Sequence, residues 1–129
     1  MASHQNLSIA FTHERYGSSR PYLYHLTDRS NLDPIRETRT LLPAATLMER
    51  SGRVELLRIR RRAHERVDVD NRSILIRDQA PLHKGNVVLE IGFSFDDFVE
   101  SINRRIFFWP GKAGGPISYG IRHFERYQD

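Results

Sequence analysis

Two side chains with the chemistry to bind a ligand, His25 and Thr27, lie two residues apart. An imidazole and a hydroxyl can each donate and accept hydrogen bonds. The aromatic and aliphatic segment Tyr22–Leu26 predicts a β-strand that runs into Thr27. Residues at this spacing on a strand share a face, and ligands often bind where such strands end. The alternative is that His25 is a satisfied core histidine and Thr27 an ordinary strand residue.

Three further side chains are candidates because of where they lie in the predicted elements. Arg77 ends a predicted strand, and its guanidinium fork suits a diphosphate, although an Arg–Asp surface pair with Asp78 is the alternative. Trp109, the only tryptophan, could stack on a planar ring or simply pack in the core. Tyr119 follows a glycine-rich loop and could close over a ligand, with the loop as a lid.

A basic run gives a second kind of candidate site, consisting of Arg58, Arg60, Arg61 and Arg62. On one face of a helix these guanidinium groups would contact a phosphate backbone, which predicts nucleic-acid binding. A solvated face paired with neighbouring glutamates is the alternative. The chain has 20 Lys and Arg against 16 Asp and Glu, a net charge of +4 and a pI of about 9.8, which fits either reading.

Composition excludes several classes of site. The chain of 129 residues has no cysteine, which excludes a disulfide framework, a thiolate zinc site and a cysteine nucleophile. Its six histidines show no i, i+4 pair on one predicted helix, so we predict no metal site. There is no apolar run of about 20 residues and no signal-peptide pattern, so we expect a cytoplasmic protein without a membrane span.

The pattern of apolar and turn-forming residues predicts a polar arm over residues 1–20, with an ordered piece at Leu7–Phe11, and one domain over residues 21–129. Asp28 or Ser30 should cap a short helix that carries Leu32 and Ile35. A hairpin should join Arg66–Val69 to Ser73–Arg77. The remaining expected helices are Ala44–Ser51 closed by Gly52, Val54–Arg62, Leu82–Ile91, one capped by Ser94, and Tyr119–Tyr127 with Ile121, Phe124 and Tyr127 inward.

The end of the chain is expected to contain a buried strand and a loop. Ile106–Trp109 is a short apolar run, typical of a buried strand. Pro110–Pro116 is rich in glycine and proline, which indicates a flexible loop. Together these elements predict an α+β fold, with a small, mixed, curved sheet flanked by helices.

Three segments carry a resemblance to a known group of folds. The run YLYHLTDRSNLDPIRETRTLL resembles the opening of ADP-ribosyltransferase-like folds, in which a first strand with His-x-Thr leads to an Asn-Leu-x-x-Ile helix. It is similar in this respect to the DNA-targeting ADP-ribosyltransferase toxins. The segments Ile74–Leu82 and Ile102–Pro110 resemble an uncharacterised bacterial family of that type, with Arg-Asp-Gln-x-Pro and Phe-Phe-Trp motifs.

The resemblance implies a site for NAD as substrate. His25 would donate to a ribose hydroxyl, Thr27 would bond the nicotinamide amide or the ribose, and Asn31 would hold the diphosphate side, unless Asn31 is only a helix cap. Arg77, Trp109 and Tyr119 would complete the site. The resemblance identifies no catalytic acid, because folds of this type carry their glutamate late in the chain and this chain is expected to be shortened there.

The resulting hypothesis is NAD-dependent ADP-ribosyl transfer, or at least NAD binding, in a bacterial or phage conflict system, with nucleic acid as a candidate target. The alternative is a non-catalytic module that keeps the fold and binds a nucleic acid or a protein. A sheet that stops early would leave an unpaired edge near Phe107 and the last helix. We therefore expect a homodimer or a partner subunit that completes the sheet.

Overall fold

The computed structural model describes residues 13–127, which divide between two compact units. The terminal unit contains the chain up to Leu26 and from Phe107 onward, and the central unit is Thr27–Ile106. Each unit has helices and an antiparallel sheet of its own, so the predicted α+β class is confirmed. The predicted single mixed sheet is wrong, because the described strands form one sheet of three and one of two, and both are antiparallel.

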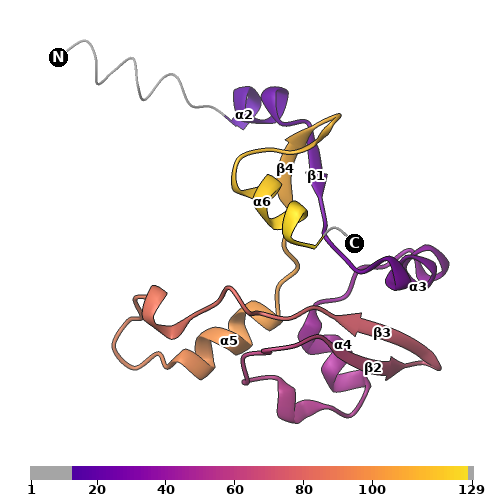
Figure 1. The fold of residues 1–129 in the computed structure, drawn as a ribbon, viewed down its shortest axis with the longest axis vertical. Coiled ribbons are helices and arrows are strands. Elements are labelled where there is room, and N and C mark those ends of the chain that lie inside the picture. The colour runs from indigo at the N-terminus through magenta and orange to yellow at the C-terminus, as the bar shows by residue number, and fades with distance from the viewer. Residues whose placement is uncertain (1–12, 128–129) are drawn as a thin grey trace. The chain divides into compact units, whose positions relative to one another are not determined.

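The described part of the terminal unit contains a three-stranded sheet and the helices α2 and α6, which come before and after its strands in the sequence. Its elements are α2 (His13–Ser19), β1 (Tyr22–Tyr24), β4 (Trp109–Lys112), β5 (Gly115–Pro116) and α6 (Tyr119–Arg126). β4 is the middle strand and pairs with β1 through Tyr24 opposite Trp109 (Figure 1). The Tyr24 hydroxyl donates to the Lys112 carbonyl, which adds a side-chain bond between these strands.

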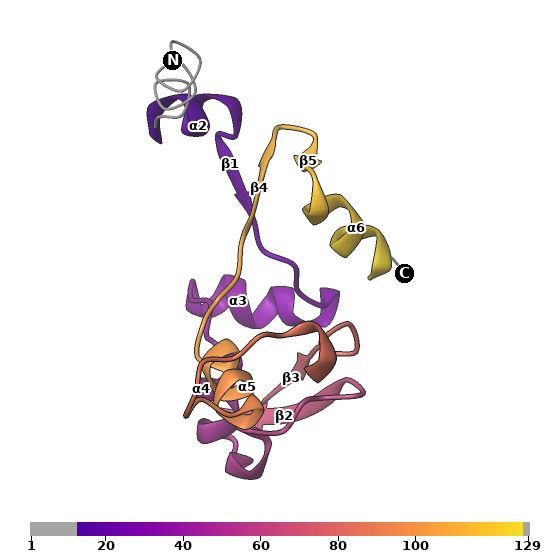
Figure 2. The same ribbon diagram turned by 90° about the vertical axis from the view of Figure 1, so that its left-hand side faces the viewer.

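Pro110–Pro116, which we expected to be a flexible loop, instead forms most of the β4–β5 hairpin. Gly111 allows the two strands to approach closely. A Cβ atom on Gly111 would lie 2.2 Å from the Gly115 carbonyl oxygen, so only glycine permits this close pairing. Figure 2 shows β4 turning into β5 just before α6. The glycines that indicated a loop are therefore the residues that allow two backbones to approach.

Four further predictions for the terminal unit need correction. β1 ends at Tyr24, so His25 and Thr27 lie beyond the strand and the alternation rule does not apply to them. The arm predicted over residues 1–20 contains the helix α2, and its predicted ordered piece Leu7–Phe11 lies outside the described residues. Ile106–Trp109 is not a buried strand, because its two phenylalanines are exposed. In α6, Ile121 and Phe124 are exposed instead of facing inward.

The central unit surrounds one apolar core. Its helices are α3 (Leu32–Thr38), α4 (Ala44–Arg50) and α5 (Phe95–Asn103), its strands are β2 (Glu65–Val69) and β3 (Arg72–Ile76), and its 3₁₀ turns are η1 (Arg29–Asn31), η2 (Val54–Leu56) and η3 (Lys84–Asn86). α4 lies against the β2–β3 hairpin (Figure 1). The core between them consists of Met48, Leu56, Val67, Val69 and Ile76.

Local sequence signals in the central unit are confirmed where they rest on turn and cap chemistry. Asp70 and Asn71 both have positive φ, 51° and 64°, as a two-residue hairpin turn requires. Gly52, with φ of 73°, follows α4. Ser94 forms a capping box with Asp97 at the start of α5. Asp28 caps η1, the turn directly before α3, through the Ser30 N–H, whereas α3 itself has no side-chain cap.

Two predicted helices of the central unit are wrong. Val54–Arg62 forms only the turn η2, because the chain then leaves the helix direction to pair Arg61 with Gln79. Leu82–Ile91 forms only the turn η3. Val88 and Ile91 are fully exposed, so this segment lacks the packing that stabilises a short helix. None of the helices within residues 13–127 is long and apolar enough to cross a membrane.

Candidate functional site

His25 is exposed, and the Phe107–Phe108 segment fixes its ring. Its Nδ1 atom lies 3.0 Å from the Phe107 carbonyl oxygen. Its ring lies 5.6 Å from the Phe108 ring, centroid to centroid, at an interplanar angle of 53°. One bond and one ring contact therefore hold an exposed imidazole in place, and they join two segments that are distant in sequence. His25 is not the core histidine that the alternative reading proposed.

Trp109 belongs to a second aromatic group of the terminal unit. Its ring packs 5.5 Å from the His123 ring of α6, and His123 in turn contacts Tyr127 edge-on. Gly120 is buried beneath this contact, because a Cβ there would lie 3.0 Å from the Trp109 Cβ. Trp109 is half-buried, so it serves packing while part of its ring stays accessible.

Tyr119, the first residue of α6, is 71% exposed. The Arg122 guanidinium lies 5.7 Å from its ring centroid, and the same arrangement occurs for Arg126 with Tyr127 and for Arg20 with Tyr16. These contacts are of the cation–π type, in which a guanidinium packs over an aromatic ring. The described part of the terminal unit thus presents arginine beside tyrosine at α2 and at α6.

Thr27 and Asn31 lie together in the central unit, where Asn31 has a structural task. The buried Asn31 side chain accepts from the Leu75 N–H at 2.9 Å and donates to the Leu75 carbonyl at 2.8 Å. Its Nδ2 also donates to the Thr27 hydroxyl oxygen at 3.0 Å. The side chain pairs with β3 as a neighbouring strand would, so Asn31 occupies the N-cap position of α3 but makes no side-chain cap bond there.

Arg77 is mostly buried and lies near the turn that begins at Asp28. One guanidinium nitrogen is 3.9 Å from an Asp28 carboxylate oxygen and 3.5 Å from the Thr27 carbonyl. Hydrogen bonds from the Ser30 side chain and backbone, and then the charge of Arg77, hold the pKa of Asp28 below its usual value. The structure therefore brings Arg77, Thr27 and Asn31 together, with Asp28 as a charge partner of Arg77.

A buried polar network joins three segments of the central unit, and sequence reasoning missed it. Arg61 donates to the Asn103 side-chain oxygen at 2.8 Å and to the Arg77 carbonyl at 2.9 Å. Gln79 also donates to the Asn103 oxygen, at 3.2 Å, and Asn103 donates to the Leu57 carbonyl at 2.9 Å. Gln79 belongs to the Arg-Asp-Gln-x-Pro motif of the resemblance stated above, Asn103 lies in its segment Ile102–Pro110, and both are buried in this network.

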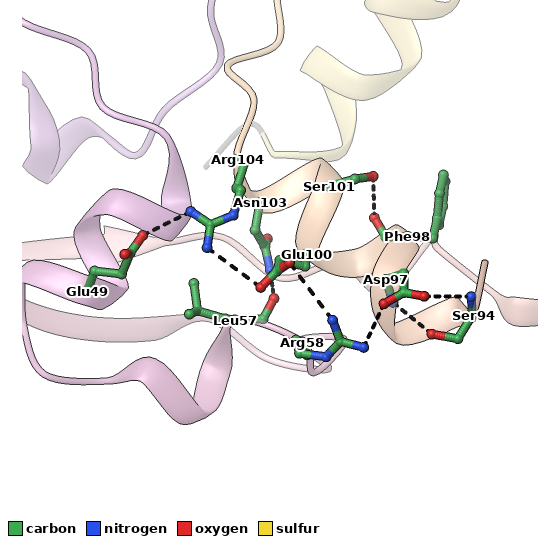
Figure 3. A network of polar contacts seen from close by, with 10 residues as sticks. All are labelled: Glu49, Leu57, Arg58, Ser94, Asp97, Phe98, Glu100, Ser101, Asn103 and Arg104. Carbon is green, nitrogen blue, oxygen red and sulfur yellow. Dashed lines mark hydrogen bonds and ion pairs between the residues drawn. The ribbon is translucent and has the colours of Figure 1, made fainter. Parts of the chain in front are cut away.

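The four arginines of the basic run do not form a helix face. Arg61 is buried in the network just described, and Arg60 donates to the Ala80 carbonyl. Arg58 pairs with Asp97 at 2.8 Å and Glu100 at 3.8 Å, beside a second pairing of Arg104 with Glu49 and Glu100 (Figure 3). Arg62 is exposed. Three of the four guanidinium groups are therefore engaged within the chain.

The Arg58 network gives the clearest electrostatic effect in the molecule. The Ser94 N–H and the Arg58 guanidinium donate to the Asp97 carboxylate, and together with the Ser94 side chain they lower the pKa of this carboxyl to about 2. A shallow surface depression beside it is lined by Phe93, Asp97, Glu100, Ser101, Arg104 and Arg105. Within its lining, Arg104 pairs with Glu100 and Arg105 donates to the Ser101 carbonyl, while Asp97 pairs with the neighbouring Arg58, which is typical of a stabilising surface network.

These features define an α+β protein with a hydrogen-bonded central unit and an aromatic terminal unit. Residues 21–120 match the profile of DUF7002, a family of unknown function, and the chain belongs to this family. No curated protein and no solved structure matches the chain.

Proposed function

We propose that this chain binds NAD, the substrate of ADP-ribosyl transfer, and that the terminal unit supplies the residues that recognise its rings. The fixed and exposed imidazole of His25 carries this proposal. A group that is held by the fold and open to solvent loses little freedom when it binds a ligand. The resemblance of the His-x-Thr segment to ADP-ribosyltransferase-like folds supplies the identity of the ligand.

NAD offers two planar rings and several ribose hydroxyls, which match the groups that the terminal unit exposes. Phe108 is 43% exposed beside His25, and Tyr119 is 71% exposed on α6. Exposed aromatic rings of this kind bind planar bases by stacking, at roughly 1–3 kcal/mol for each base. The proposal therefore assigns hydroxyl recognition to His25 and ring stacking to the aromatic residues.

Thr27, Asn31 and Arg77 belong to the central unit, so the proposed site, which lies within the terminal unit, does not include them. Thr27 accepts a hydrogen bond from Asn31, and the Asn31 amide is also bonded to Leu75, so these two side chains serve the central unit.

The transfer reaction itself makes a further demand. As the bond between nicotinamide and ribose breaks, positive charge develops on the ribose, and a carboxylate would stabilise it. The carboxylates in the described part of the terminal unit are Glu14 and Glu125. Neither makes a hydrogen bond or an ion pair with His25 there. Binding is thus the core of the proposal, and transfer is the reaction that the resemblance implies.

Calorimetry with NAD tests this function. We expect wild-type chain to bind NAD and His25→Ala to weaken binding about fivefold, because one hydrogen bond contributes on the order of 1 kcal/mol. His83→Ala is the matched control, since His83 is an exposed histidine of the central unit. Absence of binding by the wild type, or equal affinity of wild type and His25→Ala, would contradict the proposal.

The tyrosine–arginine contacts favour a second candidate function, binding of single-stranded nucleic acid. Arg20 with Tyr16, Arg122 with Tyr119 and Arg126 with Tyr127 combine a ring for stacking with a cation for phosphate. They are better placed for this than the run Arg58–Arg62, in which Arg61 is buried. Of that run, Arg62 remains an exposed candidate for a phosphate contact.

Fluorescence anisotropy with a single-stranded oligonucleotide tests the second function. We expect affinity to fall steeply with salt, as counterion release requires. The double substitution Tyr16→Ala and Tyr119→Ala should weaken binding, while Arg58→Ala should change it little because Arg58 is paired with Asp97. If binding depends on Arg58 and not on the tyrosines, the nucleic-acid interface is the basic run Arg58–Arg62 instead of the terminal unit.

A further inference from the structure

The contact between His25 and Phe107 determines which histidine nitrogen carries the proton. The acceptor at 3.0 Å from Nδ1 is a backbone carbonyl oxygen, which has no hydrogen to donate. Nδ1 must therefore be the protonated nitrogen. A neutral imidazole carries one N–H only, so its Nε2 atom is then an unprotonated acceptor.

We infer that the Phe107–Phe108 segment holds neutral His25 in the Nδ1–H tautomer, so that His25 recognises a hydroxyl or N–H donor of its ligand through Nε2. The Phe107 carbonyl sets the proton position, and the Phe108 ring restricts rotation of the imidazole. These two residues act as positioning residues for His25. The inference rests on the proposed NAD binding only for the identity of that donor, which would be a ribose hydroxyl.

This assignment reverses the direction of the hydrogen bond that the resemblance implied. His25 would accept from a ribose hydroxyl in its neutral form instead of donating to it. Protonation of His25 turns Nε2 into a donor, because both nitrogens of the imidazolium carry hydrogen. The acceptor role therefore belongs to the neutral form alone, and an imidazolium would instead donate from Nε2 to the oxygen of the same hydroxyl.

Nitrogen NMR on protein with ¹⁵N-labelled histidine tests the tautomer without any ligand. At a pH where His25 is neutral, we expect Nε2 to give the signal of an unprotonated nitrogen and Nδ1 that of a protonated one. The Phe108→Ala variant should shift His25 toward a mixture of tautomers, whereas Phe108→Tyr, which keeps the ring, should not. A neutral His25 with its proton on Nε2 in the wild-type chain would overturn the inference.

The ligand half of the inference has its own test. Two NAD analogues are compared, each of which lacks one of the two hydroxyls of the nicotinamide ribose. We expect one of them to bind the wild-type chain about fivefold more weakly than NAD does. The same analogue and NAD should bind His25→Ala equally. Equal affinity of the wild type for NAD and both analogues would overturn the hydroxyl assignment. If NAD itself does not bind, the proposed function fails, while the NMR measurement still decides the tautomer.

Discussion

The central and terminal units use their side chains in opposite ways. The central unit buries an apolar core around Met48 and saturates its buried amides, Asn31, Gln79 and Asn103, with hydrogen bonds. The described part of the terminal unit buries no apolar side chain, although the unit holds all five tyrosines and the only tryptophan. The buried polar side chains of the central unit stabilise its fold, whereas several aromatic rings of the terminal unit are exposed and can contact a ligand.

This difference divides the motif residues of the sequence into two groups. Asn31, Gln79 and Asn103 hold backbone segments together and have little left to offer a ligand. His25 and Phe108 are exposed and contact each other through their rings. A short motif can therefore contain a structural residue and a binding residue side by side, and only the contacts separate them.

The largest effect should follow from breaking the central network. Asn103→Ala removes the acceptor of the buried Arg61 guanidinium and of Gln79, so we expect a loss of roughly 3 kcal/mol in the free energy of unfolding. Urea denaturation followed by circular dichroism measures it. Asn86→Ala, at an exposed asparagine, is the control and should change stability little. Equal stability of the two variants would contradict a structural role for Asn103.

A second substitution tests whether the terminal unit responds on its own. Gly111→Ala places a Cβ against the Gly115 backbone and should open the β4–β5 hairpin, at a cost of about 1–3 kcal/mol. Fluorescence of Trp109 reports this unit, because Trp109 is the only tryptophan. Gly114→Ala is the matched control, since a Cβ there meets no atom within 4 Å. If Gly111→Ala and Gly114→Ala have the same Trp109 emission, the hairpin does not depend on this close approach.

Local chemistry explains which parts of the fold were predictable from sequence. Three features depend on neighbouring residues, and the sequence predicts each of them: the hairpin around Asp70–Arg72, the Gly52 helix end and the Ser94 cap of α5. The conformation of Val54–Arg62 depends on a partner distant in sequence, Gln79, whose position cannot be inferred from the local pattern of residues. Pro110–Pro116 was missed for a similar reason, because its glycines serve strand pairing across the hairpin.

The candidate site was predictable to a smaller extent. His25 could be selected from its residue type and from the resemblance, but its anchor, the Phe107 carbonyl, is a backbone group 82 residues away. No side-chain pattern signals such a partner. The burial of Arg61 was equally hidden, because in the sequence it looks like one of several adjacent surface arginines.

A smaller, pH-dependent effect should appear in the charged network of the central unit. The folded-state pKa of Asp97 is about 2, below its ordinary value of 3.8, so the ionised form is stabilised by folding. This contribution is complete above the ordinary value and is lost as the pH falls through about 2. Asp97→Asn should therefore lower the urea midpoint at pH 6 and match the wild type near pH 2. Asp96→Asn, in the same helical turn, is the control, and a difference between Asp97→Asn and wild type that is equally large at both pH values would contradict the pKa assignment.

The smallest effect concerns assembly. The edges of the terminal sheet are β1 and β5, whereas β4 is paired on both sides, so the edge expected near Phe107 is not where the sheet is open. If a second copy completes this sheet, it should do so along β1, where Leu23 is 68% exposed. We expect light scattering to detect a weak dimer that Leu23→Pro abolishes. If the chain is a monomer at all concentrations, a second copy does not complete this sheet.

An NMR titration of the ¹⁵N-labelled chain with NAD is the most direct test of whether the terminal unit binds the ligand while the buried polar network of the central unit serves stability. The account predicts that the backbone signals of His25, Phe107 and Phe108 and the indole signal of Trp109 shift in a saturable way. The signals of Gln79 and Asn103 should stay unchanged, because these residues serve the central network. Shifts confined to the central network, or no saturable shift at any NAD concentration, would contradict the assignment of ligand binding to the terminal unit.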